Sequence, residues 1–251
     1  MLYQVEWYPH FAYNENTYDI QLISKKTYEE SLAYYNKPKT GCLALLQQCR
    51  ELGEQLDPLE LGLSDKANQV CKAAELGCST KVSGAWNADT SIAGDRSAFD
   101  IAHLNPDGHP TNYLIGFFNQ EWVQKELGVP VNFTANSNLV GNVLVFSPPY
   151  DAYRRAGMKD IEYLLDSGVK VTLMYGDRDY VCPWLGVEKL SLAANWTGAD
   201  NFRTAGYQQV QKDDKDLQGV VRQHGNLSFT RVLQAGHDGK QPLLKISDQR
   251  S

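Results

Sequence analysis

The stretch Val169-Lys-Val-Thr-Leu-Met-Tyr175, followed at once by Gly176-Asp-Arg-Asp179, decides the fold that we expect. The β-forming residues of Val169–Tyr175 predict a strand of the kind found inside a parallel sheet. One amphipathic helix is expected before this strand, over Lys159–Asp166, and another after it, over Trp184–Ala194. This alternation of helix and strand predicts an α/β fold.

The last third of the chain continues with further strands. Gln208–Gln211 and Gln218–Gln223 are expected to form a hairpin around the charged turn Asp213–Asp216. A second β-rich run, Leu227–Leu233, leads into Ala235-Gly236-His237. Two predicted strands therefore end next to side chains that can carry out acid–base chemistry.

The first 150 residues are less regular. Residues 1–40 are rich in aromatic residues, Asn and Pro, and they predict irregular structure that closes with a helix over Lys26–Asn36. Residues 80–150 predict loops around one helix, Gln120–Leu127, which Gly128 ends.

Four cysteines lie on two predicted helices between residues 40 and 80, with Cys42 and Cys49 on the first and Cys71 and Cys78 on the second. Antiparallel packing of two such helices places the first cysteine of one opposite the last cysteine of the other. Of the three possible pairings of four cysteines, this geometry favours Cys42–Cys78 and Cys49–Cys71. A reduced helical hairpin with cysteines along its seam is the alternative. A zinc site is not expected, because no Cys-x-x-Cys motif or suitably spaced histidine accompanies them.

The composition excludes several classes of protein. Hydrophobic residues make up 42% and charged residues 22% of the 251, which is typical of a globular chain. The formal net charge of −6 and the lack of a Lys/Arg run argue against a nucleic-acid partner. No apolar stretch reaches the roughly 18–20 residues that a bilayer span needs, so no membrane partner is expected.

Three sequons, at Asn132, Asn195 and Asn226, predict N-glycosylation and favour a secretory route. The N-terminus, however, has neither the basic nor the apolar segment of a signal peptide. Either the chain is cytosolic or its true start lies upstream, and these residues leave both possibilities open.

Asp177 and Asp179 follow one predicted strand, and His237 follows a later one. In open α/β sheets, functional groups gather outside the carboxyl ends of the strands. An Asp after one strand and a His after a later strand match the last two members of the Ser–Asp–His order of α/β-hydrolases. Such an Asp would orient the imidazole, and the His would take and return the proton of a nucleophile. Taken singly, Asp179 is better explained as a turn former and His237 as an ordinary loop residue. Taken together, each at the end of a strand, they fit the catalytic and the structural interpretation equally well.

These residues also carry a resemblance to a known family. The stretch from Gly176 to Gly186 (GDRDYVCPWLG) closely resembles the motif around the catalytic aspartate of serine carboxypeptidases, especially the fungal and yeast vacuolar members. Ala235-Gly236-His237 is similar to their catalytic histidine motif, residues 118–129 to their N-x-x-x-V-Q-x-x-L-G-V segment, and residues 7–14 to their sequence after the central strand. The resemblance implies that Asp179 and His237 are catalytic.

The same resemblance implies more about the site and the fold. Cys182 would be an unpaired cysteine in the substrate pocket, with Val181 beside it. A nested double disulfide in a helical insertion is also a feature of the family. The implied fold is a partial α/β-hydrolase, with residues 1–110 as connecting segment and helical insertion (cap) and residues 111–251 as the C-terminal part of the core.

The nucleophile motif Gly-x-Ser-x-Gly occurs nowhere in the 251 residues. In the family it lies upstream of the segment that resembles residues 7–14, so we expect a C-terminal portion whose nucleophile and signal peptide lie outside this sequence. The polar residues 238–251 depart from the apolar and Pro-containing continuation of the family, which puts the closing helix of the fold in doubt.

The function implied by the resemblance is serine-type carboxypeptidase activity. A complete enzyme of this kind would release C-terminal amino acids from peptides or proteins through an acyl-enzyme, in a secreted or vacuolar setting, without a metal or organic cofactor. The alternative is a catalytically inactive fragment or a secreted non-enzymatic binding domain, which the absent serine favours for this chain alone. A different α/β-hydrolase, such as an esterase, is a third interpretation.

Overall fold

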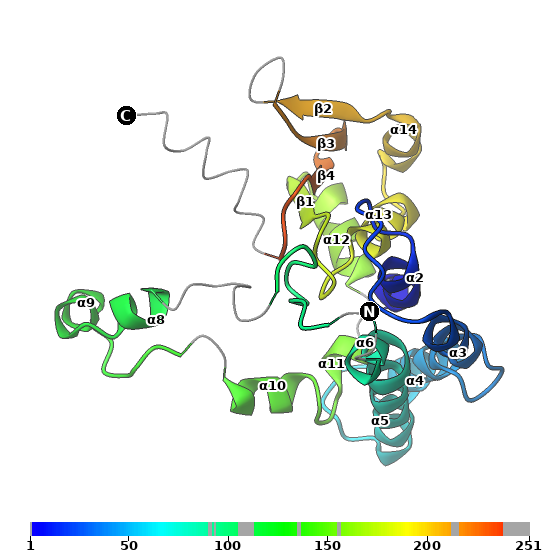
Figure 1. The fold of residues 1–251 in the computed structure, drawn as a ribbon. Helices are drawn as coiled ribbons and strands as arrows, with labels where there is room; N and C mark the ends of the chain where they lie inside the picture. Colours follow the sequence, from blue (N-terminus) through cyan, green and yellow to red (C-terminus); the bar gives the residue numbers. More distant parts are fainter. Residues whose placement is uncertain are drawn as a thin grey trace.

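The structure, a computed structural model, contains a four-stranded mixed sheet, which lies toward the upper end of the molecule in Figure 1. The structure describes residues 2–89, 92, 94–104, 113–134, 137–154, 157–211 and 216–237. The strands are β1 (Val171–Gly176), β2 (Gln208–Gln211), β3 (Leu217–His224) and β4 (Leu227–Val232), in the spatial order β1-β4-β3-β2. The expected mixture of strands and helices in an α/β arrangement is confirmed.

The pairing of β1 with β4 brings the two candidate strand ends together. These strands are parallel, from Val171 opposite Leu227 to Gly176 opposite Val232. The strand β3 is antiparallel to both β4 and β2. Because β1 and β4 run in the same direction and end in register, the residues that follow them emerge at one edge of the sheet. Within the described residues, β1 pairs with no strand other than β4, so its outer side is an open edge.

Helices α12 (Met158–Asp166), α13 (Trp184–Ala193) and α14 (Ala199–Thr204) pack against the sheet through an apolar cluster. Phe202, Leu227 and Phe229 lie in this cluster and are almost fully buried. The helices α12 and α13 begin and end within two residues of the predicted ranges, as does β1. Residues 212–215 and 238–251, which include most of the predicted hairpin turn and the polar tail, lie outside the described residues.

A second apolar cluster lies in the disulfide-bonded helical pair formed by α4 (Cys42–Leu56) and α5 (Asp65–Cys78). The hydroxyl of Ser64 accepts the N–H of Ala67 and caps α5, as expected of a serine at this position. Disulfide bonds join Cys42 to Cys78 and Cys49 to Cys71, with Cα atoms 5.1 and 4.7 Å apart. This is the nested pairing that the spacing favours, and Figure 1 places the pair at the opposite end of the molecule from β2.

Within residues 1–40, the prediction of a closing helix is confirmed, but the prediction of irregular structure is wrong for residues 2–13. Short helices α1 (Leu2–Val5) and α2 (Trp7–Tyr13) precede α3 (Lys25–Tyr35), the predicted helix. Pro9 is the third residue of α2, in the first turn, where a backbone N–H has no intrahelical partner and a proline is tolerated. Burial of Val5 and Phe11 stabilises these helices through tertiary contacts that local pattern does not reveal.

The loop-rich prediction for residues 80–150 missed several short helices. The predicted helix is α9 (Glu121–Leu127), which ends at Gly128 with a left-handed φ of 66°. The others are a π-helical turn η1 (Ser79–Ser83), α6 (Ala85–Ala88), α8 (Tyr113–Phe118), α10 (Asn138–Leu144) and α11 (Asp151–Arg154). Elements of four to seven residues are too short for apolar periodicity to identify.

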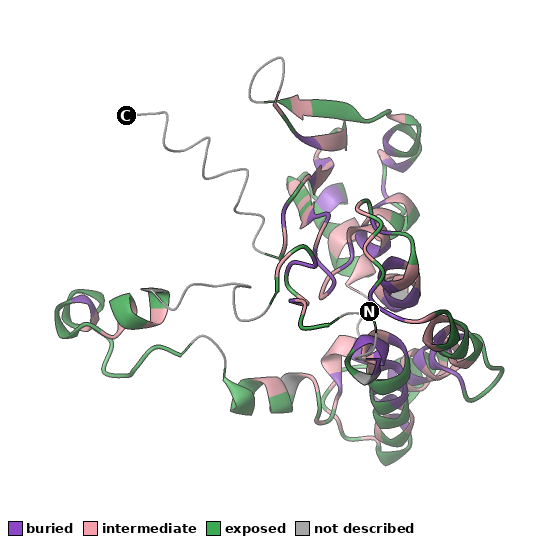
Figure 2. Ribbon diagram, viewed as in Figure 1, coloured by how far each residue is buried: buried purple, intermediate pink, exposed green. Residues whose placement is uncertain are grey.

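Figure 2 shows that α8, α9 and α10 project from the body with mostly exposed surfaces. Large apolar side chains there are exposed, among them Phe117, Trp122, Leu139 and Val140. Within the described part of the chain, no helix combines the length and the apolar character that crossing a bilayer requires.

Candidate active site

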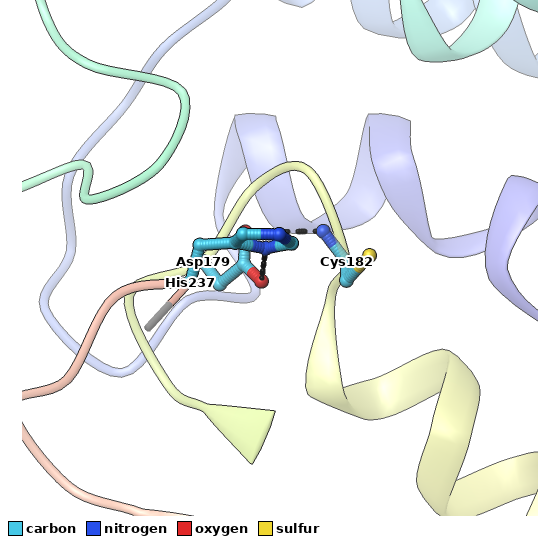
Figure 3. A group of neighbouring side chains, drawn as sticks. All are labelled: Asp179, Cys182 and His237. Carbon is cyan, nitrogen blue, oxygen red and sulfur yellow. Dashed lines mark hydrogen bonds and ion pairs between the residues drawn. The ribbon is translucent and has the colours of Figure 1, made fainter. Parts of the chain in front are cut away.

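Asp179 and His237 meet at the edge of the sheet where β1 and β4 end (Figure 3). The Oδ2 of Asp179 lies 2.8 Å from the Nδ1 of His237. The aspartate side chain is 2% exposed and the imidazole 38% exposed. When the carboxylate is ionised it can only accept, so Nδ1 carries the proton and Nε2 is left to exchange a proton with a third group.

The Asp179 carboxylate is fixed by a second contact. Its Oδ1 accepts the backbone N–H of Cys182 at 3.1 Å, which Figure 3 shows beside the bond to His237. Burial raises the pKa of Asp179, and the hydrogen bond from His237 opposes that rise. The result is a buried acid with one oxygen held by the chain and the other aimed at the imidazole.

Two glycines allow the chain to pack closely around the histidine segment. A Cβ atom on Gly176 would lie 2.3 Å from the carbonyl oxygens of Ala235 and Gly236, and one on Gly236 would lie 2.3 Å from the oxygen of Phe99. The carbonyl of Phe99 also accepts the N–H of His237 at 2.7 Å. The glycines in both motifs therefore have a packing reason. A side chain at Gly176 would push the histidine segment away from β1, and one at Gly236 would push it away from Phe99 and Asp100.

Asp177, the other candidate carboxylate, is fully buried and bonded elsewhere. It accepts the hydroxyl of Tyr18 at 2.9 and 3.0 Å, and the guanidinium of Arg231 lies 3.5 Å away. Burial raises the pKa of Asp177, while Tyr18 and Arg231 lower it. The geometry gives Asp177 a structural role and leaves Asp179 as the residue that faces the imidazole.

Cys182 is the free cysteine of the described residues, and its thiol lies beside the Asp179–His237 pair. Burial, followed by the charge of Asp179, raises the pKa of the Cys182 thiol to about 11, so the thiol is protonated at neutral pH. The carbonyl of Val181 accepts the hydroxyl of Tyr8 at 2.6 Å, which anchors the same segment. The structure therefore brings Cys182 and Val181 to the site, and their role as a substrate pocket stays a prediction.

Asp179, Cys182 and His237 also form a cluster whose potential ligand atoms lie within 4.8 Å of one another. A metal ion would need the thiolate of Cys182 and would have to compete with the bond between the other two residues. The raised pKa of the thiol and the 2.8 Å carboxylate–imidazole contact fit a proton-transfer pair better than a metal centre.

The three sequons lie in different environments. Asn132 and Asn195 are exposed. The Nδ2 of Asn226, by contrast, donates to the carbonyls of Leu165 and Val169 at 2.8 and 2.7 Å. Both hydrogens of that amide are therefore used to join the β3–β4 turn to the chain before β1, and a glycan would replace one of them.

Comparison with known proteins gives a consistent result. Residues 3–245 match the serine carboxypeptidase family. The chain is 42% identical over 229 residues to a carboxypeptidase Y homolog of Arthroderma benhamiae, covering 90% of this chain and 36% of that protein. It is 40% identical over 237 residues to carboxypeptidase S1 homolog B of Arthroderma otae, covering 93% of this chain and 35% of that protein. The chain thus spans little more than a third of the length of these relatives.

A solved structure shows the same fold. The chain superposes with a TM-score of 0.50 on Kex1(Δ)p, a prohormone-processing carboxypeptidase from Saccharomyces cerevisiae. The match covers 89% of this chain and 50% of that one at 17% sequence identity, so it bears on the fold alone.

Proposed function

Because the chain belongs to the serine carboxypeptidase family, we propose that Asp179 and His237 supply the acid–base part of a serine carboxypeptidase active site. The observation that carries this proposal is the 2.8 Å contact between the buried carboxylate and the Nδ1 of the half-exposed imidazole. A neutral imidazole bonded in this way presents a basic Nε2, as proton abstraction from a hydroxyl requires.

The reaction would proceed in two halves. Nε2 of His237 takes the proton of a serine hydroxyl while the serine oxygen attacks the carbonyl of the last peptide bond, and Asp179 stabilises the imidazolium that forms. The imidazolium then gives its proton to the departing amino acid, which leaves an acyl-enzyme. A water molecule, deprotonated by the same imidazole, attacks the acyl group and restores the serine.

The serine in this proposal comes from polypeptide outside residues 1–251, since no Gly-x-Ser-x-Gly motif lies within them. The open edge of β1 supports this arrangement. A further parallel strand added there would end at the same side of the sheet as Asp179 and His237. In this proposal, residues 1–110 form the connecting segment and cap, and residues 111–251 form the C-terminal part of the core.

Peptide or protein C-termini are the proposed substrates, and a secreted or vacuolar location is proposed with them. The nested disulfides support an oxidising compartment, because such bonds are rare in the reducing cytosol. Exposed sequons at Asn132 and Asn195 support the same route.

A second candidate function is a non-enzymatic one, and the observation that favours it is the lack of a nucleophile motif in the sequence. The two functions are separated by joining this chain to the part of the A. benhamiae relative that it does not match. We expect the joined protein to release the last residue of an N-blocked dipeptide, and residues 1–251 alone to show no release above background.

Two histidine variants complete that experiment. His237→Ala in the joined protein is expected to lower kcat by at least roughly a thousandfold, as loss of a triad member does. His224→Ala, at the end of β3, is the matched control and should retain activity. A joined protein that folds without activity, or a His237→Ala variant that keeps it, contradicts the proposal.

A further inference from the structure

The hydroxyl of Tyr18 joins the ends of the two strands that carry the candidate site. Tyr18 lies in the loop between α2 and α3, and its hydroxyl donates to the carboxylate of Asp177, with O–O distances of 2.9 and 3.0 Å. The same oxygen accepts the backbone N–H of Gln234 at 2.9 Å. One side chain therefore bonds to the residue that follows β1 and to the segment that leads from β4 to His237.

The bond to Gln234 is placed where the histidine segment changes direction. Gln234 has a left-handed φ of 55°, which a non-glycine residue adopts only when its surroundings hold it. The N–H groups of Leu233 and His237 bond to the backbone carbonyls of Gln218 and Phe99, at 2.9 and 2.7 Å. Between these two backbone contacts, the Gln234 amide is held by side chains. The Tyr18 hydroxyl accepts its N–H at 2.9 Å, and the Asp177 carboxylate is a further acceptor for it.

Other contacts hold Tyr18 itself in place. Asn16 is 5% exposed, and its Oδ1 accepts the N–H of Tyr18 at 3.2 Å. The Nδ2 of Asn16 donates to the carbonyls of Phe11 and Ile20, at 2.9 and 2.6 Å, which closes the loop around the tyrosine. The guanidinium of Arg178 lies over the Tyr18 ring, 4.7 Å from its centre. The hydroxyl is therefore presented in a fixed position.

We propose that Tyr18 is a positioning residue for His237. Its hydroxyl ties the turn at Gln234 to Asp177, two residues before Asp179, and so holds the imidazole in register with its carboxylate partner. The Tyr18 hydroxyl bonds to Asp177 and Gln234, so it acts on the Asp179–His237 pair through the chain that carries them. This role rests on the proposed function, because positioning matters only where the pair transfers protons.

The test follows the Nδ1–H proton of His237 by NMR and measures its exchange with water in the chain of 251 residues. Tyr18→Phe keeps the ring under Arg178 and removes the hydroxyl alone. We expect the proton to exchange faster by roughly five- to tenfold, the factor that loss of one hydrogen bond produces. Tyr28→Phe is the matched control, since it also removes a phenolic hydroxyl, one that lies 3.1 Å from the Nδ1 of His10. Tyr28→Phe should leave the exchange rate of the His237 Nδ1–H proton unchanged.

A purely structural role would lower the unfolding midpoint of Tyr18→Phe without changing the exchange of this proton in the folded protein, and that result overturns the proposal. Asp177→Asn provides a second variant, because an amide oxygen can still accept from Tyr18. We expect it to change the exchange rate by less than about twofold. If Asp177→Asn speeds the exchange as much as Tyr18→Phe does, the proposal is overturned, because the position of His237 would then depend on the Asp177 carboxylate and not on the bond between Tyr18 and Gln234.

A measurement on the unchanged chain covers the case in which a variant fails to fold. The Gln234 amide should be protected from exchange, and an unprotected amide overturns the positioning role. The Nδ1–H proton of His237 also separates this inference from the proposed function. If the unchanged chain shows no hydrogen-bonded Nδ1–H on His237, both fail, whereas a bonded proton that is insensitive to Tyr18→Phe overturns only the positioning role.

Discussion

The disulfide-bonded helical pair and the four-stranded sheet are stabilised in different ways. The helical pair has two covalent links and an apolar cluster of its own, built around Cys42, Leu46 and Ala74. The sheet relies on packing of Leu227 and Phe229 against its helices, and the outer side of β1 is open within the described residues. The candidate catalytic pair lies on the sheet, the region without covalent links, so its geometry depends on packing and hydrogen bonds.

The largest expected loss of stability comes from removing a large side chain from the apolar core beside the sheet. Phe229→Ala removes a fully buried ring, and the cavity should cost about 3–5 kcal/mol in the free energy of unfolding. Urea unfolding followed by NMR, residue by residue, should show the loss in β1–β4 and leave α4 and α5 unchanged. Phe117→Ala, at an exposed phenylalanine of α8, is the matched control and should cost little. Equal loss in both regions would show that they unfold as one unit.

The reverse experiment breaks the helical pair. Cys42→Ala with Cys78→Ala opens a link between residues 36 apart in sequence, and the bond between Cys49 and Cys71 spans 22. Loss of either bond should cost roughly 3–4 kcal/mol on the chain-entropy account. Hydrogen exchange should rise in α4 and α5, while the Asp179–His237 contact persists. Collapse of that contact on loss of one disulfide contradicts the independence of the two regions.

Lowering the pH should change the stability of the sheet and of the disulfide-bonded helical pair in opposite directions. Burial raises the pKa of Asp177 and Asp179 beside the sheet, so these groups bind protons more tightly in the folded chain. The sheet region should therefore gain stability as the pH falls from neutral through those raised values, and the gain is complete below the unfolded value of about 3.9.

Asp57, which follows α4, behaves in the opposite way. Its hydrogen bond with Arg154, 2.7 Å long, holds the pKa of Asp57 below its usual value. The stabilisation from this pair is present above a pH of about 3.9 and is lost as the pH falls through the lowered pKa. Urea midpoints of each region at pH 7, 5 and 3 measure both trends, and Asp57→Asn should remove the acid loss. Parallel changes in the two regions would contradict the assignment of these shifts.

The parts of the fold that could be predicted are those whose sequence carries a pattern over neighbouring residues. The strand around Val171–Gly176 and the helices beside it follow from composition and periodicity, and the two cysteine pairs follow from their spacing. Helix α2 could not be predicted, because Pro9 and the neighbouring aromatic residues resemble a turn until the burial of Phe11 is known. Short helices such as α8 and α10 carry too few residues for a periodic signal.

The same division applies to the site. Asp179 and His237 follow strands, so the rule for strand ends finds them and the parallel pairing of β1 with β4 explains why. Tyr18 lies 159 residues from Asp177 and 216 residues from Gln234, and no local pattern joins residues so far apart. The sequence therefore predicts which groups transfer protons but not which groups hold them in register.

The central claim is that Asp179, and not its neighbour Asp177, is the carboxylate partner of His237 in catalysis. The most direct measurement compares the same substitution at both positions in the joined protein, using kcat for release of the last residue of an N-blocked dipeptide. Asp179→Asn should lower kcat by roughly ten thousandfold, because the imidazole loses the carboxylate that fixes its tautomer. Asp177→Asn should cost less than about tenfold, since its oxygens face Tyr18 and Arg231. Equal losses, or a larger loss at Asp177, would contradict the account.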